Sequence, residues 1–185
     1  SLQGELPGAD KFGPLDLNGK KIGWFGNFEN YLAMEPGIIE LCESSLTSLG
    51  DAGAIVEPTM PQFDLSDLWQ CWSDLRHWSR IGMRDLYEND DTRALLKPEV
   101  IWEIERSYIL TADEIYAANS VRRRWSRELD RLFDQYDFLA LPTAQVFPFP
   151  KDLHWPTEIN GRQMDTYHRW MEIVIAASLA GIPTI

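Results

Sequence analysis

The sequence predicts an α/β fold: a partial mixed or parallel sheet flanked by helices, with a mostly helical insertion. Three observations lead to this prediction. Short apolar runs bounded by Gly and Pro recur at three places, as expected for buried strands. A stretch with helical periodicity separates the first run from the second. A much longer helical stretch, at about residues 63–134, separates the second run from the third.

The first two strands and the helix between them form one unit. Residues 21–25 (KIGWF) are a short apolar strand, and Pro36 stands where a helix would begin. Apolar side chains then recur at spacings of three and four, at Ile39, Cys42, Leu46 and Leu49. Residues 54–56 are the second strand, closed by Pro58. A strand, a helix and a strand within about 35 residues predict a parallel crossover.

The long helical stretch divides into three predicted helices. In the first, apolar residues recur at helical spacing: Leu65, Leu68, Trp72 and Leu75. The second begins at Pro98, because Pro is favoured in the first turn. The third begins at the capping box from Thr111 to Glu114. It leads to residues 137–141, which we predict as a third buried strand ending at Pro142.

Two further elements are predicted near the end of the sequence. Asn160-Gly161 is the dipeptide favoured in tight hairpin turns. The stretch from Tyr167 to Ala180 has the pattern of a final helix, which Gly181 ends.

The composition excludes several classes of partner. The chain carries 17 basic and 29 acidic side chains, a net charge of −12, so phosphate backbones and anionic lipids do not attract it. No apolar run approaches the ~20 residues that span a bilayer. We therefore expect neither nucleic acid nor membrane as a partner. Cys42 and Cys71 lie in helical patterns and are expected to be free thiols, which favours the cytoplasm.

Catalytic and metal-binding motifs are weak in this sequence. No serine lies in a Gly-x-Ser-x-Gly turn, and Ser44-Ser45 lies in the middle of a predicted helix. No histidine has a second His or Cys at metal-ligand spacing, so we predict no metal site. A hydrolase that uses His154 or His168 with a distant serine stays open as an alternative. The arginines at 122–124 are expected on a solvated helix face.

Several segments resemble one enzyme family. Residues 136–143 (YDFLALPT) resemble the strand of amidase-signature enzymes that ends in a Pro-Thr turn. Residues 167–172, running into 178–185, resemble the late helix of that family and the Gly-(apolar)-Pro turn after it. Residues 17–23 and 53–56 resemble two strands that follow the family's signature segment. The order of these segments matches the family.

The resemblance implies an enzyme that hydrolyses carboxylic amides with a Ser–Ser–Lys triad and without metal or organic cofactor. In the family the nucleophile lies in a Gly-Ser-rich segment, which this sequence does not contain. We therefore assign no catalytic residue. Residues 1–185 are expected to be a single α/β fragment of a larger amidase domain, inactive by itself. The expected partner is a small-molecule amide, and a homodimer is a candidate assembly.

The resemblance also implies which residues face the substrate. Thr143 follows a strand at its carboxyl end, where open α/β sheets bind ligands. Tyr167, Trp170 and Glu172 lie on or near the late helix, which contributes to the substrate cavity in the family. For each of the four residues, packing in the core is the alternative role. The alternative for the whole chain is a self-contained α/β binding or regulatory module. A Gly-Gly-Ser-Ser-Gly-like stretch encoded upstream would decide for the amidase.

Overall fold

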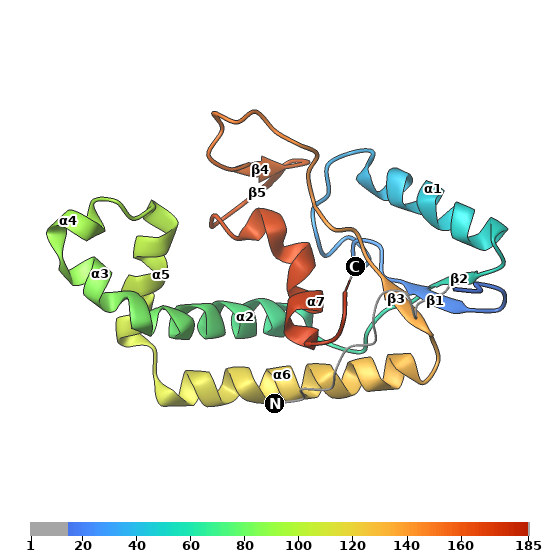
Figure 1. Ribbon diagram of the computed structural model, residues 1–185, viewed down its shortest axis with the longest axis horizontal. Helices are drawn as coiled ribbons and strands as arrows, with labels where there is room; N and C mark the ends of the chain where they lie inside the picture. The colour runs from blue at the N-terminus through green and yellow to red at the C-terminus, as the bar shows by residue number, and fades with distance from the viewer. Residues whose placement is uncertain (1–14, 185) are drawn as a thin grey trace.

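The computed structural model describes residues 15–184. Its main sheet has three parallel strands in the order β2-β1-β3. The central strand is β1 (Lys21–Trp24), between β2 (Ile55–Pro58) and β3 (Phe138–Ala140). Helix α1 (Ile38–Asp51) connects β1 to β2, so the predicted crossover unit is confirmed (Figure 1). The mixed α/β architecture with a small parallel sheet is the predicted fold class.

The three strands differ in burial. In β1, Ile22 and Trp24 are buried. In β2 and β3, by contrast, Ile55 is 43% exposed and Phe138 is 40% exposed. The predicted third strand at 137–141 is therefore present as β3 but is only partly buried: Leu139 and Leu141 pack against the core, whereas Phe138 is exposed. The physical reason is position: β3 is an edge strand here, and only β1 has a neighbour on both sides.

A long helical region separates β2 from β3, as predicted. Its elements are α2 (Leu65–Ser79), the 3-10 helix η2 (Arg80–Met83), α3 (Arg84–Glu88), α4 (Asp90–Arg93), α5 (Pro98–Ile109) and α6 (Ala112–Phe133). Helices α2 and α6 lie side by side, while α3, α4 and α5 gather at the end of the molecule far from the sheet (Figure 1). None of the described helices is both long and apolar enough to cross a bilayer.

The starts of these helices follow the predicted signals. Pro98 is the first residue of α5. At α6 the capping box is reciprocal, because Glu114 N donates to Thr111 Oγ1 at 3.2 Å and Thr111 N donates to Glu114 Oε2 at 2.7 Å. Both bonds use backbone N–H groups that the helix itself leaves unpaired.

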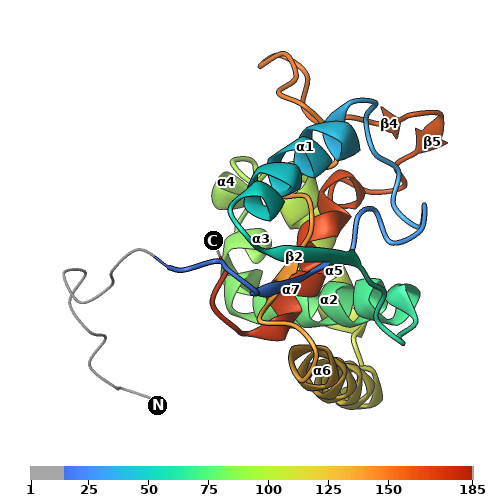
Figure 2. The same cartoon turned by 90° about the vertical axis from the view of Figure 1, so that its right-hand side faces the viewer.

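The main core lies between α2, α6 and the final helix α7 (Ile175–Ala180). Trp125 of α6 is 1% exposed, and its indole Nε1 donates to the carbonyl of Ala176 at 2.9 Å. Figure 2 shows α6 end-on beneath α2. Leu129 and Leu132 extend the same apolar face of α6 at helical spacing.

The final part of the chain differs from the prediction in one respect. The Asn160-Gly161 turn joins β4 (Glu158–Ile159) to β5 (Arg162–Gln163), as predicted. The single late helix is wrong: a 3-10 helix, η3 (Arg169–Val174), precedes α7, and Met171 leaves the helical region with φ −116° and ψ 20°. The backbone N–H of Ile173 donates to the side chain of Gln145 at 3.1 Å, which draws it away from a helical carbonyl.

Candidate functional site

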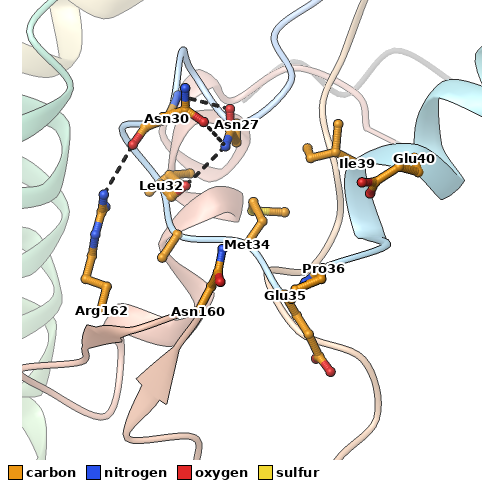
Figure 3. Close-up of a pocket in the computed structure, with 11 residues that line it drawn as sticks. Asn27, Asn30, Leu32, Met34, Glu35, Pro36, Ile39, Glu40, Asn160 and Arg162 are labelled. Atoms are coloured by element: carbon orange, nitrogen blue, oxygen red, sulfur yellow. Dashed lines mark hydrogen bonds between the residues drawn. The ribbon is translucent and has the colours of Figure 1, made fainter.

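A cavity of about 360 Å³ lies between the loop after β1 and the β4–β5 hairpin turn (Figure 3). The loop and the start of α1 contribute Asn27, Asn30, Leu32, Ala33, Met34, Glu35, Pro36, Ile39 and Glu40, and the hairpin contributes Asn160 and Arg162. The loop leaves the carboxyl end of β1, the edge at which open parallel sheets usually bind ligands.

The loop has an uncommon backbone. The three consecutive residues Phe28, Glu29 and Asn30 have positive φ angles of 55°, 53° and 70°, although none of them is a glycine. The Oδ1 atom of Asn27 accepts from the backbone N–H of Asn30 at 3.0 Å. Phe28 is buried and stacks on Phe25 with ring centroids 5.3 Å apart. Burial and side-chain hydrogen bonds therefore hold a conformation that costs free energy, as is common at ligand sites.

Polar side chains join the loop to the segments beside it. Arg162 donates to the backbone carbonyls of Tyr31 and Asn30. Gln145, which is 1% exposed, donates from Nε2 to the carbonyl of Ala33 at 3.0 Å. The same Gln145 accepts at Oε1 from the backbone of η3. The wall of the cavity is therefore fixed to the hairpin, to the chain after β3 and to η3.

Glu172 lies behind this loop in a buried network. Its Oε1 atom accepts from the Tyr31 hydroxyl at 2.9 Å, and its Oε2 atom accepts from Arg169 Nη1 at 2.9 Å. The guanidinium of Arg169 lies 3.5 Å from the ring centroid of Trp69. Burial raises the pKa of Tyr31, and the carboxylate of Glu172 raises it further. Both oxygens of Glu172 are thus occupied by protein groups.

The structure brings two of the other predicted residues together. The rings of Tyr167 and Trp170 meet edge to face with centroids 6.4 Å apart, and Phe149 lies edge to face on Trp170 at 5.4 Å. Thr143 is exposed after β3 and makes no hydrogen bond to another described residue. None of these three side chains lines the cavity of Figure 3.

Within residues 15–184, no side chain has the surroundings of an activated nucleophile. No serine hydroxyl hydrogen-bonds to a lysine or a histidine in this part of the chain, and Ser45 Oγ donates to the carbonyl of Leu41 instead. Burial raises the pKa of the Cys71 thiol to about 11, so the thiol stays protonated at neutral pH. The same residues hold no group of three or more His, Cys, Asp or Glu that could bind a metal ion.

The cavity residues were not predicted from the sequence. Asn27 and Asn30 gave a usable signal, because Asn tolerates positive φ and both follow a strand end. Arg162 gave no such signal, because the backbone carbonyls to which it donates lie about 130 residues earlier in the chain. The Asn160-Gly161 pair predicted the turn but not its place at the cavity.

The described residues form an α/β protein with a cavity beyond the carboxyl end of its central strand. Comparison with known proteins makes the class specific, because the chain matches the Amidase family over residues 7–185. The chain belongs to the amidase signature family. It is also 39% identical over 83 residues to one subunit of the glutamyl-tRNA(Gln) amidotransferase of Sulfolobus acidocaldarius, covering 43% of this chain and 16% of that protein.

Solved structures agree on the fold. One similar structure is a bacterial aryl acylamidase of the amidase signature family, with a TM-score of 0.74 and 20% identity. A second is an amidase, with a TM-score of 0.73 and 16% identity. Each comparison covers 90% of this chain but only 36% and 37% of those chains, respectively. The chain thus spans little more than a third of the enzymes whose fold it shares.

Proposed function

We propose that this chain is the post-signature part of an amidase that hydrolyses carboxylic amides to an acid and ammonia or an amine. Residues 1–185 would form one fragment of the larger domain, with the helical region at about 63–134 as an insertion. The observation that carries the proposal is the family match over nearly the whole chain. The exposed side chains of Ile55 and Phe138, on the two edge strands, are compatible with a sheet that continues beyond this chain.

In this proposal the chain supplies scaffold and part of the substrate wall. The serine nucleophile, its partner serine and the lysine base would come from a Gly-Ser-rich segment outside residues 1–185. Thr143, Tyr167, Trp170 and Glu172 are the residues that would face a small-molecule amide, with Glu172 held in place by Tyr31 and Arg169. The enzyme would act in the cytoplasm.

We expect the isolated chain to be catalytically silent, because no nucleophile in the described part is activated. The measurement is release of ammonia or nitroaniline from a panel of amides and anilides. The longer protein that contains this chain should turn over at least one of them under the same conditions.

The alternative hydrolase provides the contradicting outcome. Turnover that follows the 185-residue chain through purification, and that disappears in His154→Ala or His168→Ala, would disprove the fragment proposal. In that case one of these histidines would be the base.

A second prediction concerns the packed rings of Tyr167, Trp170 and Phe149, which we call the aromatic wall. In the longer enzyme, Trp170→Ala should raise KM or change substrate preference by roughly tenfold, because it removes the ring that packs between Tyr167 and Phe149. The measurement is kcat and KM for an aryl and a small aliphatic amide. Trp78→Ala, at an exposed position on α2, is the control. Unchanged kinetics with a lower melting temperature would assign Trp170 to the core.

One observation favours the alternative of a self-contained module. Trp125 and the residues around it close a core between α2, α6 and α7 within this chain. A gene without a Gly-Gly-Ser-Ser-Gly-like stretch upstream of this region would support the module and contradict the amidase proposal.

A further inference from the structure

Helix α5 presents two carboxylates one turn apart, and each faces a histidine of the same distant segment. We call residues 141–168, between β3 and η3, the connecting segment. The Nε2 atom of His154 lies 3.1 Å from Glu99 Oε2, and that of His168 lies 2.6 Å from Glu103 Oε1. Residues four apart lie on one face of a helix, so this face of α5 holds the connecting segment at two points.

The inner of the two pairs is buried. The side chain of Glu103 has no exposed surface, and that of His168 is 4% exposed. Glu103 accepts hydrogen bonds from Arg76 Nε at 2.9 Å and from Arg80, which come from α2 and η2. A buried carboxylate is costly unless it is paired and hydrogen-bonded, and here three basic side chains surround it. Glu103 therefore joins the helical region to the connecting segment.

Aromatic rings fill the space around the two pairs. The His168 ring lies between Trp72 of α2 and Trp102 of α5, with centroid distances of 5.2 and 5.9 Å. Tyr167 packs edge to face on His168 at 5.3 Å and lies 5.7 Å from the ring of His154. The same Tyr167 contacts Trp170. The position of the predicted aromatic wall thus depends on how the connecting segment sits on α5.

The connecting segment is also fixed at its other side, where Gln145 and Arg162 bond to the loop after β1. It therefore spans from the cavity to α5. We propose that α5 is a positioning arm, and that Glu103 and Glu99 hold the connecting segment in the place where Tyr167, Trp170 and the hairpin turn can meet a substrate. The contact with a substrate rests on the proposed amidase function. The attachment of the connecting segment to α5 does not depend on that function. Glu103 is a positioning residue and has no catalytic role.

Hydrogen–deuterium exchange of the 185-residue chain tests the structural part. Glu103→Gln removes the buried charge, and His154→Ala removes the outer pair at an exposed position. Each should raise exchange in residues 150–168 by roughly tenfold relative to the α6 amides. The matched control is Glu105→Gln on the same helix, because Glu105 accepts from the Tyr87 hydroxyl and has no hydrogen bond or ion pair with residues 141–168 of the described chain. Unchanged exchange in His154→Ala and in Glu103→Gln would overturn the proposal.

Kinetics of the longer enzyme test the positioning role. His168→Leu should lower kcat/KM by different factors for bulky and small amides, roughly tenfold apart, because the wall moves relative to the substrate. His168→Gln, which places a side-chain donor near the position of Nε2, should restore part of the loss. Equal loss for every amide would reduce Glu103 and His168 to a structural role and overturn the proposal. Faster exchange in an enzyme that hydrolyses no amide would instead refute the proposed function and leave the arm in place.

Discussion

Replacing Trp125 by Ala should destabilise the chain by about 3–5 kcal/mol, the range for deletion of a large buried aromatic side chain. Trp125 is 1% exposed and packs edge to face on Phe63, with ring centroids 5.3 Å apart. The substitution also removes the donor to the carbonyl of Ala176, which joins α6 to α7. Since a domain is stable by only about 5–15 kcal/mol, a large fraction of the stability would be lost.

Equilibrium unfolding in urea, followed by circular dichroism, measures this effect. Trp78→Ala is the control, because Trp78 is 51% exposed on α2 and should cost less than about 1 kcal/mol. A similar small loss for Trp125→Ala would mean that the core between α2, α6 and α7 is not the main source of stability.

Local signals in the sequence predicted the secondary structure well. The Thr111–Glu114 capping box, Pro98 and the Asn160-Gly161 turn each act within a few residues, so their effect can be read from the chain alone. The parallel sheet followed from the same kind of argument, because a short crossover helix leaves little choice of topology.

Long-range contacts explain where the sequence failed. The late helix breaks at Met171 because the backbone N–H of Ile173 donates to the side chain of Gln145 and not to a helical carbonyl. Gln145 lies 28 residues before Ile173 in the chain. The exposure of Phe138 depends on what lies beside β3, which periodicity cannot report. In both cases a local pattern was correct in type and was overruled by a partner elsewhere in the chain.

The candidate site shows the same division. Tyr167 and Trp170 were predicted from the resemblance and pack on each other, and their contact with substrate stays a prediction. The cavity of Figure 3 could not be predicted, because Arg162 reaches it from a hairpin far along the chain. The spacing of Glu99 and Glu103 was visible in the sequence, but their histidine partners were not.

Acid should destabilise the chain through Glu103. Burial alone would raise the pKa of this carboxyl, but the contacts of His168, Arg76 and Arg80 outweigh burial and lower the pKa from its ordinary 4.5 to about 2. Because the folded-state pKa is the lower one, the unfolded chain binds the proton first. The stabilisation is therefore present above pH 4.5 and is lost as the pH falls toward 2, with a total on the order of 3 kcal/mol.

Urea unfolding at several pH values between 6 and about 2.5 measures this dependence. Glu103→Gln should be less stable than the parent chain at pH 6 and should lose less stability on acidification, because the group that binds the proton is gone.

Glu105→Gln should follow the parent chain, since that carboxylate lies on the exposed face of α5. The exposed carboxyls with lowered pKa values, such as Asp64 and Asp137, remain in all three proteins, so their contribution cancels in the comparison. Parallel profiles for Glu103→Gln and the parent chain would show that the buried carboxylate is not the acid-sensitive group.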